Sequence, residues 1–212
     1  RMSFDQFISA VSDSLSRPLP GIKAQVIMSS MKRVHELLGT TSTEKAKPSS
    51  VLLLLYPVGE EVFIVFIQRP DYGGVHSGQI SFPGGKWEPE DMDLSSTALR
   101  ESKEEVGIIP ERVRILGKLS ELYIPPSRYL VSPFVAYCSA RPDFEKAPDE
   151  VKEIIEVNIR DLFRENAYQV TKHKIGLGIR IKAPAYVVDG HTIWGATAMI
   201  LSEFKEMIKE YL

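Results

Sequence analysis

The sequence predicts an α/β domain in which a mixed sheet lies between layers of helices. Apolar runs of strand length alternate with amphipathic helical segments along most of the chain, an order typical of sheets covered by helices. With 212 residues, the chain is long enough to bury the core of one domain. The polar stretch Gly39 to Ser50 is the one plausible boundary. We therefore expect an N-terminal helical extension over residues 1–47, packed on a domain over residues 48–212.

Two helical segments are expected before this boundary. Apolar residues recur at helical spacing over residues 4–15, and Pro18 to Gly21 breaks that segment. A second run of the same kind covers Ile22 to Leu38. Because each segment presents one apolar stripe, both helices should pack on the domain.

The strands are predicted from short apolar runs bounded by turn residues. Val51 to Tyr56 and Val62 to Gln68 are two such runs, and Pro57 to Glu60 between them is a hairpin signal. The last helix is expected from Ala196 to Tyr211. Further strands are expected at Ile115 to Leu122, Val131 to Tyr137, Ile154 to Val157 and Ile179 to Val188.

Composition narrows the partners to small molecules. The chain carries 26 basic and 28 acidic residues, and its net charge of -2 gives no footprint for DNA or RNA. No apolar run approaches the roughly 20 residues that cross a bilayer, and no signal peptide is visible. The single cysteine, Cys138, lies in an apolar run, which predicts a buried thiol in a reducing compartment such as the cytoplasm. The oligomeric state stays open, a homodimer included.

Three glutamates give the strongest indication of function. Glu101, Glu104 and Glu105 fall within roughly a 100° arc of one helix face, because an α-helix turns about 100° per residue. Carboxylates so placed repel each other unless a cation lies among them, and an oxygen-only group favours a hard ion such as Mg²⁺ or Mn²⁺. The alternative is a solvated acidic helix, but such a helix usually places Lys four residues after Glu, and Glu105 takes that position after Glu101. A small stripe beside the acidic face predicts that the carboxylates lie at the rim of a core: Ala98, Leu99, Ser102 and Val106.

These glutamates belong to a recognisable signature. Gly84-Gly85-Lys86 followed by Arg100 to Ile108 resembles the glycine loop and catalytic helix of the Nudix hydrolases. The resemblance implies an αβα sandwich, and Arg100 is then expected to orient a neighbouring carboxylate. Two departures are visible. An upstream Glu of the family is replaced by Asp91 or Asp93, and Ser102 stands where the family usually has an apolar residue.

A longer motif indicates one branch of this family. The stretch His76 to Lys86, with Phe66 to Arg69 before it, resembles the extra motif of the coenzyme A pyrophosphatases. This resemblance implies cleavage of coenzyme A or its derivatives to 3′,5′-ADP and 4′-phosphopantetheine. Branch members commonly carry another basic residue at the place of Gly74. If that residue contacts the 3′-phosphate, this chain uses another cation or prefers another substrate. Other stretches that agree with the branch are Ala24-Gln25, Val131 to Val135 and Ile193 to Ala198.

The glycine loop and the strand before it supply candidates for substrate binding. Arg69 is suited to a bidentate contact with a phosphate, and the backbone of Gly84 and Gly85 can approach closely because neither residue has a Cβ. Within the loop motif, His76 is expected to shape the loop or to contact phosphate, and Lys86 ends the substrate-binding stretch.

A general base is harder to place. Nudix enzymes often recruit one more Glu from a later loop, and the context Pro148 to Val151 favours Glu150 for this role. Glu153 and Glu156 remain alternatives.

Two further features have competing interpretations. Trp194 precedes a run of small residues, and core packing is its expected role. The alternatives are that Trp194 stacks on a base or that the start of the following helix holds an anion. His173 is expected at the surface. Four cations that alternate along the chain form either a solvated strand face or a substitute contact for the 3′-phosphate: Lys172, Lys174, Arg180 and Lys182.

Other functions remain open. A Nudix hydrolase for another nucleoside diphosphate, such as ADP-ribose or a dinucleoside polyphosphate, differs only in specificity. Capped or triphosphorylated RNA is disfavoured by the acidic balance of the chain. A non-catalytic ligand-sensing domain is of a different class, and such domains usually lose the metal carboxylates that this chain retains.

Overall fold

The computed structural model describes residues 2–38, 43, 45–73, 78–175 and 178–212. Its helices are α1 (Phe4–Leu15), α2 (Ile22–Gln25), α3 (Met31–Leu38), α4 (Leu94–Val106), α5 (Ile159–Leu162) and α6 (Gly195–Ile208). Its strands are β1 (Lys47–Val58), β2 (Glu61–Gln68), β3 (Ile80–Ser81), β4 (Gly84–Lys86), β5 (Arg114–Lys118), β6 (Leu122–Ile124), β7 (Tyr129–Tyr137), β8 (Glu153–Asn158), β9 (Tyr168–Ile175), β10 (Ile179–Val188) and β11 (His191–Trp194).

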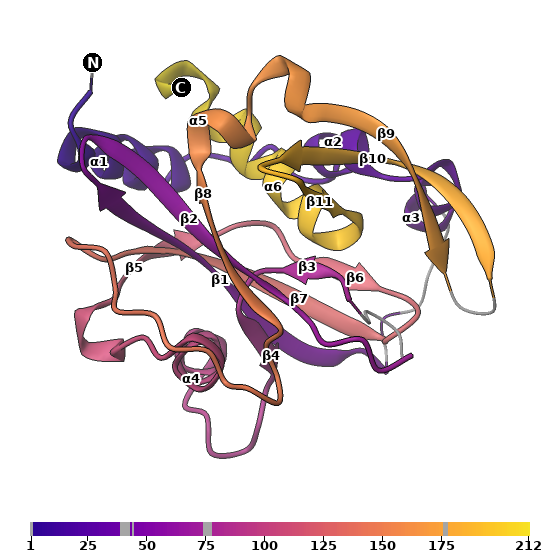
Figure 1. Ribbon diagram of the computed structural model, residues 1–212, viewed down its shortest axis with the longest axis horizontal. Coiled ribbons are helices and arrows are strands. Elements are labelled where there is room, and N and C mark those ends of the chain that lie inside the picture. Colours follow the sequence, from indigo (N-terminus) through magenta and orange to yellow (C-terminus); the bar gives the residue numbers. More distant parts are fainter. Residues whose placement is uncertain (1, 39–42, 44, 74–77, 176–177) are drawn as a thin grey trace.

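The main sheet is mixed, as the sequence predicts. Its strands follow the order β3-β2-β1-β7-β5, with β4 also paired to β1, β6 to β7 and β8 to β2. Strands β1 and β7 run parallel, whereas β2 is antiparallel to β1. A second sheet has the order β11-β10-β9, and Figure 1 shows it beside α6, with β11 next to β3.

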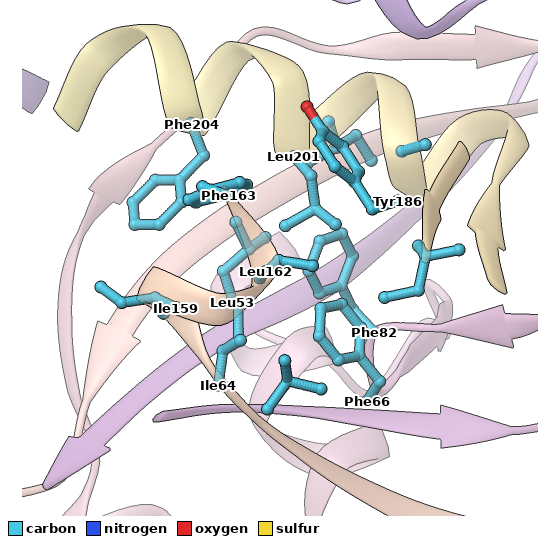
Figure 2. Packing of buried hydrophobic residues seen from close by; sticks show 14 of the residues in the cluster. Leu53, Ile64, Phe66, Phe82, Ile159, Leu162, Phe163, Tyr186, Leu201 and Phe204 are labelled. Atoms are coloured by element: carbon cyan, nitrogen blue, oxygen red, sulfur yellow. The ribbon is translucent and has the colours of Figure 1, made fainter. Parts of the chain in front are cut away.

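Strand β1 explains why the main sheet needs a helical layer on each face. Its run Leu52 to Tyr56 is fully buried, and successive side chains enter different cores because side chains alternate along a strand. Leu53 joins the core that contains Phe204 of α6 (Figure 2), and Leu52 joins the core that contains Ala98 of α4. The αβα sandwich is therefore confirmed.

The N-terminal helices share the core under α6. Phe7 and Val11 of α1 are buried in the same cluster as Phe204. The buried side chain of Glu203 accepts hydrogen bonds from the backbone of Gly21 (2.6 Å) and Ser120 (2.7 Å), which ties α6 to the segment before α2. The domain boundary after residue 47 itself stays a prediction.

The prediction of one continuous helix from Ile22 to Leu38 is wrong. Helix α2 and a 3-10 turn end at Ser29, whose backbone is extended (φ -100°, ψ 146°). The hydroxyl of Ser30 then accepts a hydrogen bond from the backbone of Arg33 (3.3 Å) at the start of α3. Serine side chains compete in this way for backbone groups, so two adjacent serines divide the segment.

Several strand predictions also need correction. Strand β1 begins at Lys47, so residues 47–50 belong to the sheet rather than to a loop, and they pair with β7. The single strand predicted at Ile115 to Leu122 is two strands, β5 and β6, because the backbone N–H of Ser120 donates to Glu203 instead of to a neighbouring strand. Strand β9 escapes prediction because none of its residues is fully buried. None of the described helices is long and apolar enough to cross a membrane.

Candidate active site

Helix α4 carries the three glutamates and has clear local signals at both ends. The Asp93 side chain accepts a hydrogen bond from the backbone of Ser96 (2.8 Å), which caps the start of the helix. Gly107 ends it in the left-handed conformation (φ 72°), where glycine avoids the clash of a Cβ. Ala98, Ser102 and Val106 are buried. The predicted stripe beside the carboxylates is thus confirmed at these three positions.

Glu105 is the most buried of the three glutamates, at 2% exposure. One of its oxygens accepts a hydrogen bond from the backbone of Gly84 (2.8 Å), and the other, Oε2, has no hydrogen-bond partner among the described residues. Burial raises the pKa of Glu105 to about 7, and the positive charge of Arg69 opposes that rise. A buried carboxylate with an unpaired oxygen needs a positive charge nearby to ionise.

Glu101 lies against the glycine loop. A Cβ built on Gly85 would stand 2.4 Å from the Glu101 carboxylate, so a larger residue here would displace that carboxylate from its present position. Burial also raises the pKa of Glu101. Glu104 is more open, with half of its side chain exposed. The three carboxylates therefore span the edge between core and solvent.

Arg100 connects the carboxylates to the loop that precedes α4. It pairs with both oxygens of Asp91 (2.8 and 2.9 Å) and donates to Glu101 (3.1 Å) and Glu104 (3.4 Å). A further bond reaches the backbone carbonyl of Lys86 (3.0 Å). The Arg100 guanidinium holds the pKa of Asp91 well below its usual range. Of the two aspartates left open by the sequence, Asp91 is therefore the partner of Arg100, and Asp93 is the helix cap.

The site fits a hard divalent cation in its chemistry. The donors are carboxylates, Glu105 Oε2 has no hydrogen-bond partner among the described residues, and the glycine loop passes close to the Glu101 carboxylate. As the side chains stand, no group of three or more His, Cys, Asp or Glu residues in the described ranges is close enough to enclose an ion. Arg100 draws Glu101 and Glu104 towards itself. The ligand set therefore stays a prediction.

The glycine loop is anchored from both sides. The Phe82 ring is buried against Phe66, with ring centroids 5.2 Å apart (both are in Figure 2). A Cβ on Gly84 would stand 2.3 Å from the carbonyl oxygen of Ser50 in β1, so this position also requires glycine. The Lys86 side chain is mostly exposed, with its ammonium 3.7 Å from Glu88.

Two other residues predicted for the site change the pKa of Glu105. Arg69, directly after β2, lowers the pKa of Glu105, and Glu150 raises it. Glu156 is engaged elsewhere, since it accepts hydrogen bonds from Tyr56 (2.9 Å) and Arg141 (2.7 and 2.9 Å). The structure thus brings Glu150 near the centre and gives Glu156 a structural role.

Some predicted features lie elsewhere. His76 and Gly74 fall outside the described residues. Cys138 is buried, as predicted, and burial raises its pKa. The four alternating cations form two cross-strand pairs on β9 and β10: Lys172 with Lys182 and Lys174 with Arg180.

Sequence reasoning missed one arrangement near the site. His173 is half-buried rather than exposed, and its ring stacks on that of Trp194 with centroids 4.0 Å apart and an interplanar angle of 14°. The two residues lie on different strands. Neither spacing nor periodicity in the sequence links them.

Comparison with known proteins gives the family. The model of the NUDIX domain matches residues 46–175, which include the glycine loop and all of α4. The chain belongs to the Nudix family. It is 34% identical over 149 residues to a protein of Yersinia pestis (strain Pestoides F) described as the uncharacterized Nudix hydrolase NudL, covering 70% of this chain and 73% of that protein.

Solved structures agree on the fold. A MutT/nudix family protein from Enterococcus faecalis is 17% identical with a TM-score of 0.52, covering 92% of this chain and 76% of that one. A MutT protein from Methanosarcina mazei Go1 is 18% identical with a TM-score of 0.50, covering 78% of this chain and 95% of that one. This Nudix chain is accordingly an enzyme of the pyrophosphohydrolase type.

Proposed function

We propose that this Nudix hydrolase is a Mg²⁺-dependent enzyme that cleaves the diphosphate linkage of coenzyme A or its derivatives. The products are 3′,5′-ADP and 4′-phosphopantetheine. The observation that carries the proposal is the carboxylate centre at the glycine loop, where Glu105 is buried with one oxygen unpaired beside Glu101. Such a centre is suited to a divalent cation and an anionic substrate.

The residues divide the chemical work between them. Glu101, Glu104 and Glu105 are the proposed ligands of Mg²⁺, with Mn²⁺ as a substitute. When bound, the cation neutralises the diphosphate and lowers the pKa of a coordinated water. Arg100 fixes the orientation of Glu101 and Glu104 through hydrogen bonds while Asp91 holds Arg100 in place.

Glu150 and Arg69 serve the reacting groups. Glu150 accepts a proton from the attacking water, a role supported by its electrostatic effect on Glu101 and Glu105. Arg69 pairs with a phosphate of the substrate. His76 and Lys86 complete the substrate-binding loop in this proposal.

The coenzyme A assignment is supported by the loop motif of the branch, which runs from the end of β2 through β4. The candidates for the cation that contacts the 3′-phosphate are Arg69 and the two basic cross-strand pairs on β9 and β10. The buried single thiol of Cys138 supports a reducing compartment, and we place the enzyme in the cytoplasm.

Another nucleoside diphosphate is the second candidate, because Gly74 provides no side chain where the branch has a cation. A ligand-sensing domain without catalysis is less well supported, since the metal carboxylates are retained.

A substrate panel tests the proposal. Coenzyme A, dephospho-coenzyme A, ADP-ribose and a dinucleoside polyphosphate are incubated with and without Mg²⁺, and products are separated by anion-exchange chromatography. We expect Mg²⁺-dependent release of 3′,5′-ADP from coenzyme A at the highest kcat/KM. Faster cleavage of ADP-ribose or the dinucleoside polyphosphate would contradict the coenzyme A assignment and leave the diphosphatase, whereas no Mg²⁺-dependent hydrolysis of any of them would contradict both.

A further inference from the structure

A cavity of about 300 Å³ lies at the end of β2, where Gln68 in its wall directly precedes Arg69. Its volume is at the lower end of the range for small-molecule sites. The end of β2 and the segment through β3 form one wall, and β11 with the end of β9 forms the other, which is consistent with the position of β11 next to β3 in Figure 1. The described residues that line it are Gln68, Gly78, Gln79, Ile80, His173, Lys174, Gly190, His191, Thr192 and Trp194.

Two aromatic rings are the most specific feature of this cavity. His173 and Trp194 stack nearly parallel at 4.0 Å. The edge of the His173 ring is held in place, because its Nε2 lies 2.5 Å from the hydroxyl of Thr171. Burial lowers the pKa of His173, which favours the neutral form of the imidazole.

The polar lining suits the edge of a heterocycle. Gln68 and Gln79 each carry an amide with both donor and acceptor atoms, and Thr192 adds a hydroxyl. Gln68 already donates to the carbonyl of Gly78 (3.3 Å), which fixes its amide within the wall. None of the described lining residues is acidic, so a phosphorylated ligand would meet no carboxylate there.

The cavity is continuous in sequence with the catalytic residues. Arg69 follows Gln68 directly, and its backbone N–H donates to the carbonyl of Gln79 (3.0 Å). The charge of Arg69 acts on Glu105. A ligand with its ring in the cavity therefore lies next to the strand end that carries Arg69, the proposed phosphate contact.

We propose that this cavity is the nucleoside subsite, in which the planar base of the substrate stacks on the His173–Trp194 pair and the two glutamine amides contact its edge. The inference rests on the proposed function, since it takes the substrate to be a nucleoside diphosphate. Of the four cations on β9 and β10, only Lys174 is among the described residues that line the cavity.

Tryptophan fluorescence tests this proposal without turnover. The chain has two tryptophans, and Trp87 is exposed, so Trp87→Phe leaves Trp194 as the single reporter. We titrate this protein, without added metal, with 5′-AMP and with ribose 5-phosphate. Saturable quenching by AMP and none by ribose 5-phosphate is the expected result. Equal quenching by the two would show a phosphate site and overturn the base assignment.

His173 variants provide the second measurement. His173 lies on an edge strand, so its replacement is compatible with folding. Stacking of a base is worth about 1–3 kcal/mol, so His173→Ala should weaken AMP binding about 5- to 150-fold and raise the KM of a nucleoside diphosphate more than it changes kcat. His173→Phe keeps a flat ring and should restore most of the affinity.

The outcomes separate this inference from the proposed function. If diphosphates are hydrolysed but AMP does not quench Trp194 and His173→Ala leaves KM unchanged, the subsite is wrong and the enzyme assignment stands. If AMP quenches Trp194 and no diphosphate is hydrolysed, the nucleoside subsite is supported and the proposed function is wrong.

Discussion

The carboxylate centre and the cavity wall differ in how the chain builds them. The centre uses residues close in sequence, from Gly84 to Glu105, joined by short hydrogen bonds around Arg100. The cavity combines the end of β2 with β11, more than a hundred residues later. The family model covers the first region and the cavity residues of β2, β3 and β9, and it ends at residue 175, before β11. The carboxylate centre is thus built largely from one stretch of sequence, whereas the cavity depends on long-range packing.

The largest effect is expected at the carboxylate centre. Glu104→Gln keeps the shape of a half-exposed side chain but removes a charge from the proposed metal site, so kcat should fall by several orders of magnitude for every substrate. Circular dichroism should show an unchanged fold. The exposed Glu111→Gln is the matched control and should keep full activity. Near-normal Mg²⁺-dependent turnover of Glu104→Gln would remove Glu104 from the ligand set.

The next largest loss of activity is expected at Glu150, in the segment before β8. Glu150→Gln should lower kcat by about 10²–10⁴-fold with little change in KM, the usual range for a general base. Glu156→Gln should instead lower the melting temperature, because it weakens the contacts with Tyr56 and Arg141. A large loss of kcat in Glu153→Gln or Glu156→Gln, with Glu150→Gln active, would move the base within the loop.

The preference between two substrates should respond to changes in the cavity. A charge-assisted contact with the 3′-phosphate contributes about 1.5–3 kcal/mol, so kcat/KM for coenzyme A should exceed that for dephospho-coenzyme A at least tenfold. Lys174 is the first candidate because it lines the cavity, and Lys174→Ala should erase the preference while dephospho-coenzyme A is still cleaved. Lys209→Ala, the same charge change near the C-terminus, should leave the ratio unaltered. Equal rates of wild-type enzyme on both substrates would count against coenzyme A.

The pairing of Arg100 with Asp91 can be tested by measuring the free energy of unfolding. Asp91→Asn should lower the free energy of unfolding by about 2 kcal/mol, because it removes the charge that pairs with Arg100. Asp93→Asn should cost little, since Asn caps helices as well as Asp. The folded state lowers the pKa of Asp91, so its contribution is complete above the unfolded value of about 3.9 and is lost as the pH falls below it. Chemical denaturation at pH 7 and at pH 3 should therefore show a smaller difference between wild type and Asp91→Asn in acid.

The smallest expected effect is a gain in the free energy of unfolding. Ser102 is fully buried, and its hydroxyl has no hydrogen-bond partner among the described residues. Ser102→Ala removes an unsatisfied polar group at little cost in volume and should stabilise the fold by about 1 kcal/mol. A loss of stability in urea denaturation would show that the hydroxyl has a partner in solution.

The sequence predicts the elements that depend on residues close to one another along the chain. Helix α4 follows from the stripe of small residues beside its glutamates, and the buried strands β1 and β2 follow from their apolar runs. It does not predict that Ser29 and Ser30 interrupt a helix, or that Glu203 ends β5 by binding Ser120, because those outcomes depend on which partners lie nearby in space.

The candidate site likewise has features that the sequence predicts and features that it does not. The glutamates and Arg100 are visible as a motif, but the choice of Asp91 over Asp93 requires the bend before α4. The stacked pair His173 and Trp194 comes from β9 and β11, which lie on either side of β10 in the second sheet, so no local sequence pattern links the two rings.

The carboxylates on α4 are expected to form a metal centre that is independent of the cavity wall. Mn²⁺ binding followed by electron paramagnetic resonance tests it without any substrate. We predict that the wild-type protein binds Mn²⁺, that Glu105→Gln binds it at least about tenfold more weakly, and that His173→Ala retains the wild-type affinity. Unchanged Mn²⁺ affinity in Glu105→Gln would contradict this expectation.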